Sequence, residues 1–290
     1  MAAQSVAKEL TELGFLGPGG NEGHSLKRFQ RRALQNFRKL KSGAGVSTVP
    51  AFKGSVSGTI DDATLAEIAI WQARGYVAPL GLLKLVNIEG GGTLRDDVGA
   101  AWTALAQNIA KKGGTIAGPY GDTKRPLMKT TSVGASKYSF HIVGRAVDLN
   151  QALGDPKNQR YFVLQETTGG VTWWRIYCKA DDQKGSQGVK VAAGVKQAYR
   201  FGDGQLYKIP EGYYLDLTAE IEGGGQFERI HAQSGWTASG PGYRKTEWWH
   251  FQWVPDKQPT FQDECELVGI TEQQLRNAGY NDEDLDHVPG

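Results

Sequence analysis

The sequence predicts an α+β fold, with a small three-helix N-terminal domain followed by an α+β domain whose sheet is mostly antiparallel. Three observations predict it. Apolar residues in the first 75 positions recur at intervals of three and four, as on one face of a helix. From residue 141 onward, short runs rich in β-branched and aromatic residues are bounded by glycine, aspartate and asparagine. The 39 glycines among the 290 residues suit a chain with many turns.

Three helices are expected in the N-terminal domain. The first covers residues 6–13 and ends at Gly14, and the second covers residues 26–41. The second helix has an apolar stripe of Leu26, Phe29, Ala33, Phe37 and Leu40. The third covers residues 63–74, with Asp61 or Asp62 as its N-cap and Gly75 as its C-cap. A linker near residues 75–82 then divides the chain into domains 1–80 and 81–290.

The second domain is expected to begin with a helix and to continue with strands. Val98, Trp102, Leu105 and Ile109 form one apolar face of this helix, which Gly113 and Gly114 stop. The strand-like runs after it are HIVGRAVDL, YFVLQET, VTWWRIYCKA, KQAYRF, GYYLDLTAEI and EWWHFQW. Residues 270–280 predict a terminal helix with a capping box, and the acidic tail 281–290 is expected to be loose.

Composition excludes two classes of protein. The chain carries 33 basic and 31 acidic residues, a net charge of +2, which argues against a dedicated nucleic-acid binder. It has no apolar run near 18 residues, so we expect no membrane span. Its first residues lack a basic segment followed by an apolar one, so no secretory signal is expected. We expect a monomer.

Two features of the chain leave alternatives open. Cys178 and Cys265 are far apart, so we expect buried free thiols first, a single disulfide next and a nucleophile last. The second helix is strongly basic, which indicates either a solvated helix face or attraction to anionic polymers of the cell envelope. Its basic residues are Lys27, Arg28, Arg31, Arg32, Arg38, Lys39 and Lys41.

The segment Thr246–Trp253, TEWWHFQW, places a glutamate and a histidine among three tryptophans. Indoles usually seek burial, and a carboxylate or an imidazole in a partly dry place needs a partner or a metal. Upstream, His141 and Asp148 lie seven residues apart, so both side chains can face one ion only if the chain bends between them. Gly144 permits that bend.

These residues form a candidate zinc site. His141, Asp148 and His250 offer two imidazoles and one carboxylate, which leaves the fourth position of a tetrahedral zinc ion open to water. Glu247 lies three residues before His250, where it can act as general base and acid on that water. A second E-x-x-H, from Glu228 to His231, lacks the tryptophan setting and is not expected to serve.

The pattern S-x-H-x-x-G-x-A-x-D followed downstream by E-x-x-H resembles zinc D-alanyl-D-alanine carboxypeptidases and the related peptidoglycan endopeptidases. Their fold is shared with lysostaphin-type peptidases and the Hedgehog signalling domain. The resemblance covers roughly residues 83–256 and implies one catalytic Zn²⁺ on His141, Asp148 and His250, with Glu247 as base. It also places Arg125 at the spacing where some members carry an arginine that holds the substrate carboxylate or the transition-state oxyanion. Under the resemblance, Ser139 either donates a hydrogen bond to the substrate or orients the ligand loop.

The N-terminal 75 residues resemble the small three-helix peptidoglycan-binding domains of cell-wall hydrolases, in part through Gly58–Ala66, GTIDDATLA. Together the two resemblances imply a zinc peptidase that cuts peptidoglycan stem peptides or cross-links, with peptidoglycan as its partner and the bacterial cell wall or periplasm as its place of action. Without a signal peptide, lysis by a phage, injection by a secretion machine or another route would deliver it. The alternative is a non-catalytic zinc protein that binds wall or peptide on the same scaffold.

Overall fold

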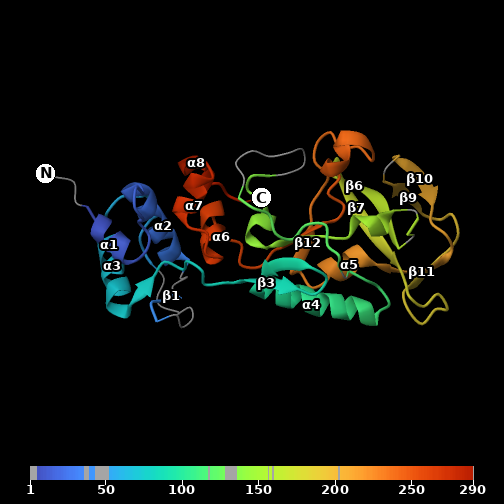
Figure 1. Ribbon diagram of the computed structural model, residues 1–290, viewed down its shortest axis with the longest axis horizontal. Helices are drawn as coiled ribbons and strands as arrows, with labels where there is room; N and C mark the ends of the chain where they lie inside the picture. Colours follow the sequence, from blue (N-terminus) through green and yellow to red (C-terminus); the bar gives the residue numbers. More distant parts are fainter. Residues whose placement is uncertain are drawn as a thin grey trace. The chain divides into compact units, whose positions relative to one another are not determined.

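The computed structural model describes residues 5–35, 39–42, 52–116, 118–127, 136–155, 157–158, 160–201 and 203–289. Its helices and antiparallel sheets confirm the predicted α+β class (Figure 1). The chain divides into two compact units. The first consists of Met1–Lys84 together with Gln258–Gly290, and the second of Leu85–Lys257.

The first unit is mostly helical. Its N-terminal part contains α1 (Ala7–Glu12), α2 (Glu22–Leu34), α3 (Asp62–Arg74) and the paired strands β1 (Lys39–Leu40) and β2 (Tyr76–Val77). Its C-terminal part contains α6 (Phe261–Leu267), α7 (Glu272–Asn277) and α8 (Asp282–Leu285). The Asp61 side chain accepts a hydrogen bond from Thr64 N at 2.7 Å and so starts α3, while Gly75, at φ 67°, ends it.

Aromatic packing makes the core of this unit. Phe15, Phe29 and Trp71 meet edge to face with ring centroids 5.2–5.5 Å apart, and Tyr76 joins them through Trp71. All four side chains are buried. Their apolar area and ring geometry stabilise the contact between the short N-terminal helices.

The second helix is shorter than its apolar spacing predicts. It ends at Leu34 with Gln35 as C-cap, and Leu40 lies in strand β1 opposite Tyr76. Leu40 is partly buried and packs against the same apolar cluster from this strand, so an apolar residue at helical spacing contributes to the core without being helical. Phe37, also assigned to the helix, lies outside the described residues.

The division into units differs from the predicted domains at the C-terminus. Residues 258–290 were expected in the second domain, but they belong to the first unit. Ion pairs join α2 to this segment: Arg28 with Glu266, Arg32 with Asp263 and Arg31 with Asp286.

These pairs correct both interpretations of the basic helix for three of its seven basic residues. Arg28 and Arg32 are buried and Arg31 is mostly so, and acidic residues of the same unit partner all three. These arginines form neither a solvated face nor a cationic surface for an external polymer, and Arg38 lies outside the described residues. The acidic tail is correspondingly not loose: Asp282–Leu285 form α8 with a capping box, and Leu285 is buried.

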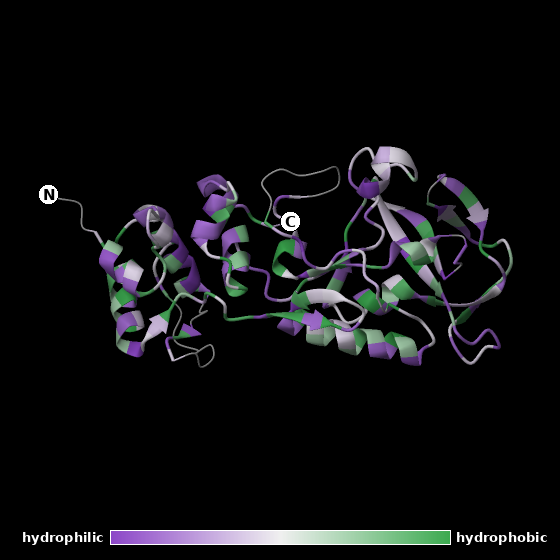
Figure 2. Cartoon of the chain, in the orientation of Figure 1, coloured by the Kyte–Doolittle hydropathy of each residue, from purple (hydrophilic) through white to green (hydrophobic). Residues whose placement is uncertain are grey.

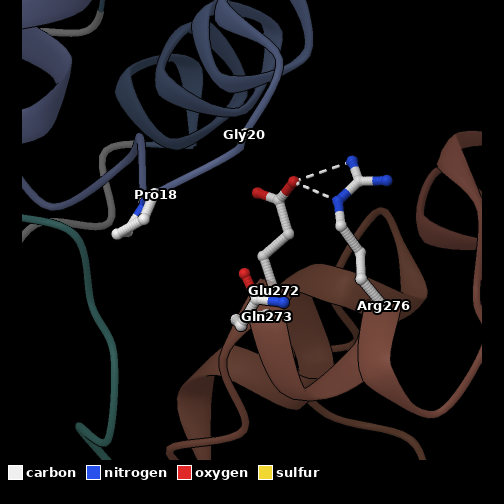
Figure 3. Close-up of a pocket in the computed structure, with 6 residues that line it drawn as sticks. Pro18, Gly20, Glu272, Gln273 and Arg276 are labelled. Atoms are coloured by element: carbon white, nitrogen blue, oxygen red, sulfur yellow. Dashed lines mark hydrogen bonds and ion pairs between the residues drawn. The ribbon is translucent and has the colours of Figure 1, made fainter.

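A very small cavity in the first unit is lined in part by an ion pair. It has a volume of about 20 Å³, the size of a single water, and is lined by Gly17, Pro18, Gly20, Glu272, Gln273 and Arg276 (Figure 3). Arg276 donates to Glu272 across one turn of α7, at 2.8 Å from Nε. The carboxylate at this cavity is therefore already paired within its own helix.

Each strand-like run of the sequence contributes a strand to the second unit, but the run GYYLDLTAEI was wrong in its second half, where Leu217–Glu222 form a helix. A hairpin of β3 (Leu85–Ile88) and β4 (Gly92–Arg95) leads into α4 (Asp96–Lys111). One sheet has the order β6-β7-β11-β8, from Tyr161–Thr168, Val171–Lys179, Gly212–Asp216 and Val189–Val191. Another has the order β12-β13-β5, from Phe227–Arg229, His250–Trp253 and Ala146–Asp148. The hairpin β9 (Gln197–Arg200) and β10 (Gln205–Lys208), helix α5 (Leu217–Glu222) and the 3₁₀ turns η1 (Phe140–Val143), η2 (Gln151–Gly154) and η3 (Gly240–Lys245) complete it.

A large apolar cluster packs α4 against the strands of this unit. Along α4, hydrophobic and hydrophilic residues alternate at helical spacing (Figure 2), and Val98, Trp102 and Ile109 are fully buried. Val147 from β5 and Phe251 from β13 belong to the same cluster, so the far face of the three-stranded sheet is core. Side chains on the other face of these two strands are therefore supported by rigid packing.

Two remaining expectations concern the thiols and the membrane. Cys178 and Cys265 are both buried and free, as the first interpretation of the cysteines predicts. Among the described helices, none combines the length and the apolar character that crossing a bilayer requires.

Candidate metal centre

Strand pairing brings two of the predicted ligands together. In the antiparallel pair of β13 and β5, His250 lies directly opposite Asp148. Directly paired residues place their side chains on the same face of a sheet, a few ångströms apart. Since Val147 and Phe251 point to the core on the opposite face, Asp148 and His250 point away from it.

The third ligand reaches the same place through a turn. His141 lies in η1, not in the extended strand that the apolar run suggests, and Gly144 ends this turn at φ 68°. A Cβ atom at Gly144 would lie 2.6 Å from Arg95 N, so both the backbone angle and the close approach require glycine. The predicted bend is therefore confirmed.

Ser139 caps the turn that carries His141. Its hydroxyl accepts a hydrogen bond from the His141 N–H at 3.3 Å, and its carbonyl accepts from Ile142 N at 2.9 Å. These bonds connect Ser139 to the turn that carries His141.

Three ligand atoms converge. His141 Nε2 lies 3.1 Å from Asp148 Oδ1 and 3.2 Å from His250 Nδ1, and that Nδ1 lies 3.0 Å from the same carboxylate oxygen. All three residues are buried. Burial raises the pKa of Asp148, but the two imidazoles outweigh it and hold the pKa below its usual range. The centre therefore keeps one carboxylate negative.

The donor set fits a zinc ion. Three corners of a tetrahedron with arms of about 2.0–2.1 Å lie about 3.3–3.4 Å apart, close to the separations of these three atoms. Hydrogen atoms alone cannot satisfy the triangle, because two imidazole N–H groups that both donate to Asp148 would face each other across the 3.2 Å contact. A cation would satisfy His141, Asp148 and His250 at once.

Glu247 lies beside this centre in an unusual conformation. Its φ of 54° is in the left-handed region, which is uncommon for a residue other than glycine and costs on the order of 1 kcal/mol. Its carbonyl accepts a hydrogen bond from His250 N at 3.1 Å, which fixes the glutamate backbone to a ligand. Burial raises the pKa of the Glu247 carboxyl to about 7, and the nearby charge of Asp148 adds to the rise.

Arg125 is placed next to both ligand segments. Its N–H donates to His141 O at 3.0 Å, and its Nε donates to Asp122 Oδ2 at 2.7 Å. Asp122 in turn accepts a hydrogen bond from Asp148 N through its carbonyl, at 2.7 Å. The positive charge of Arg125 lowers the pKa of Glu247, so the guanidinium lies within electrostatic reach of the base.

The aromatic segment is buried, as its composition predicts. Trp248, Trp249 and Trp253 are each at most 6% exposed. Tyr243 packs on Trp249 at 5.2 Å between ring centroids, which supports core packing for this tyrosine. The second E-x-x-H stays apart from the ligands: Glu228 accepts from Gln252, and His231 lies against Trp173.

Titration of Glu247 gives a first prediction. In the metal-free protein the Glu247 carboxyl should titrate with a pKa of about 7, so it is protonated below that pH and charged above it. Loading with Zn²⁺ should lower this pKa, because a dication favours the charged form. Carbon-13 NMR of labelled glutamate carboxyls, with Glu247→Gln to assign the signal, measures both values. An ordinary value near 4.5 in the metal-free protein would contradict the burial of this carboxyl.

Two residues of the centre were not found from the sequence. Gln233 donates from Nε2 to Glu247 Oε1 at 2.8 Å, and Asp122 holds Arg125. Neither residue belongs to a motif, and their place beside the centre is seen only in the folded chain.

The chain was compared with protein-family models, with curated proteins and with solved structures, and none of the three comparisons finds a match. The chemistry of the centre therefore has to follow from its own residues.

Proposed function

We propose that this chain is a zinc-dependent peptidase that hydrolyses peptide bonds in bacterial peptidoglycan, in its stem peptides or cross-links. The observation that carries the proposal is the convergence of His141, Asp148 and His250 on one point, with the buried carboxyl of Glu247 beside them. A structural zinc site usually has four protein ligands, whereas three ligands and an adjacent base suit catalysis. The choice of peptidoglycan rests on the sequence resemblance.

The residues divide the work of hydrolysis. A bound zinc ion would bring the pKa of its water from about 16 toward about 7 and polarise the scissile carbonyl. Glu247 takes the proton of the attacking water and delivers it to the leaving amine. Arg125 offers its guanidinium to the developing oxyanion or to a substrate carboxylate. Ser139 keeps the His141 turn in place.

Electrostatics favour this assignment of roles. Without a metal, Asp148 stays ionised, whereas burial raises the pKa of the Glu247 carboxyl to about 7. Two carboxyls with pKa values moved apart by their surroundings are typical of a ligand and a base in one site. The long segment between Asp148 and Glu247 includes strands β6–β12 and forms the walls of the substrate cleft, which select the substrate.

The first unit is proposed to hold the enzyme to the wall, which places its action at the bacterial cell wall or in the periplasm. A tether raises the local concentration of a polymeric substrate. Because Arg28, Arg31 and Arg32 are paired within the unit, wall binding would use other groups than these three arginines. The second candidate, a non-catalytic zinc protein that binds wall peptides, is less favoured because it needs no buried glutamate beside the ligands.

Mass spectrometry of muropeptides tests the proposal. Purified sacculi are incubated with the zinc-loaded protein, with the protein stripped by a chelator, and with the stripped protein after zinc is restored. We expect new muropeptides only with zinc, and their masses name the bond that is cut. One bound zinc and firm wall binding without any new product would instead favour the non-catalytic binding protein.

A further inference from the structure

We propose that Gln233 is a positioning residue for Glu247: its side-chain amide fixes one carboxylate oxygen so that the other is the oxygen that takes the proton of the attacking water. This inference rests on the proposed function, because it gives Glu247 the part of the base. The observation behind it is the hydrogen bond from Gln233 Nε2 to Glu247 Oε1, 2.8 Å long and partly buried.

The backbone around Gln233 is held on both sides. Ala232 N donates to Thr172 O in β7 at 2.9 Å, and Gln233 N donates to Lys245 O at 2.8 Å. Lys245 Nζ returns a hydrogen bond to Ser234 O at 3.1 Å. The segment that carries the amide is therefore bound to the segment that leads into Glu247, so donor and acceptor are fixed relative to each other.

The two ends of Glu247 are thereby constrained together. Its carbonyl is bonded to His250 N, and its Oε1 is bonded to Gln233. No hydrogen bond from another described residue reaches Oε2. A free glutamate side chain samples many rotamers, and holding it in one conformation before the reaction removes an ordering cost and a source of misplacement.

A neutral amide suits this position better than a charged side chain. A lysine or arginine at residue 233 would form an ion pair with Glu247 and weaken it as a base, whereas a carboxylate there would repel it. Lys245 is near in sequence, but its ammonium donates to Ser234 O. An amide donor aligns the carboxylate through a hydrogen bond and leaves its charge in place.

The test uses Gln233→Met, which keeps the length of the side chain and removes its N–H. If Gln233 positions the base, kcat should fall about 10- to 100-fold with KM within about twofold, one zinc still bound and the unfolding temperature unchanged. In a Glu247→Gln background the same change should cost nothing further, because Gln233 acts only through that carboxylate. Gln165→Met is the control, since Gln165 is exposed and bonds Tyr199 instead.

A second readout does not depend on turnover. In crystals of the zinc-loaded full chain, Gln233→Met should show the Glu247 carboxylate rotated or in several conformers, with His141, Asp148 and His250 unmoved. A Glu247 carboxylate that keeps its wild-type conformation would overturn the inference. So would a kinetic defect of Gln233→Met that appears as a raised KM, or a loss of bound zinc from this variant. If the wild-type chain hydrolyses no muropeptide, the proposed function fails, while the crystal structures still decide whether Gln233 positions Glu247.

Discussion

Replacing Glu247 with glutamine is expected to lower kcat by at least about 10²-fold, and up to about 10⁴-fold, while one zinc ion stays bound. The carboxamide has the size of the carboxylate and can still accept the Gln233 hydrogen bond, but it cannot take a proton from water at neutral pH. Zinc should remain because Glu247 is not one of the three convergent ligands. Muropeptide turnover checks the fall in kcat, and atomic absorption on the same preparations checks that zinc is retained.

A matched control is available in the other E-x-x-H. Glu228 is exposed on β12 and accepts a hydrogen bond from Gln252, so Glu228→Gln should leave both turnover and zinc content unchanged. Turnover retained by Glu247→Gln would remove this residue from the base role. Zinc lost from the same variant would mean that Glu247 contributes to the metal site and that its kinetic effect is indirect.

The ligands of the centre were predictable because they are encoded locally. His141 and Asp148 lie in one short segment whose bend requires Gly144, and His250 follows Glu247 within one turn of chain. Burial of the tryptophans follows from their apolar area. Residue types and spacing therefore predicted which three side chains the fold brings together.

The supporting residues were not predictable in the same way. Gln233 reaches Glu247 only because β12 pairs with β13 and the following segment returns along Lys245. Asp122 lies only three residues before Arg125, so this contact is local and needs no tertiary pairing. The contact of Gln233 depends on tertiary pairing that no local spacing specifies, and a single glutamine or aspartate in a loop has no distinct pattern.

The fold was predicted well where caps and periodicity agree. Asp61 and Gly75 bound α3 as expected, and Thr271 and Gln274 form the expected capping box of α7. The predicted end of α2 was wrong because Leu40 keeps helical spacing while it packs on the core from a strand. Helical spacing indicates that a residue contacts the core, but not from which element.

The charge pattern misled for a different reason. The basic helix near residue 30 predicted a solvated face or a polymer-binding face, and the acidic tail near residue 285 predicted a loose end. In the folded first unit the two segments are partners, since Arg31 pairs with Asp286 and Arg28 with Glu266.

The second prediction concerns this buried pairing. Asp263→Asn should destabilise the first unit by about 3–5 kcal/mol, because Asp263 is fully buried between Arg31 and Arg32 and its loss leaves buried positive charge without a counter-ion. The asparagine keeps the volume, so the loss is electrostatic and not a cavity. Denaturant unfolding at neutral pH measures it. Binding to purified wall should weaken as the first unit unfolds, while hydrolysis of a small soluble peptide by Leu85–Lys257 persists.

Dependence on pH separates the charge effect from a general loss of packing. Burial raises the pKa of Asp263, but the two arginines outweigh it and hold the pKa below its usual value. A lowered pKa in the folded state means that the ionised carboxyl stabilises the unit above about pH 4, and that this contribution is lost as the pH falls through the lower folded value. The difference in unfolding free energy between wild type and Asp263→Asn should therefore shrink in acid. Asp282→Asn, which breaks a more exposed pair with Arg276, should change stability by less than about 1 kcal/mol at any pH. An equal loss in both variants would mean that burial of the Asp263 charge does not hold the two ends of the chain together.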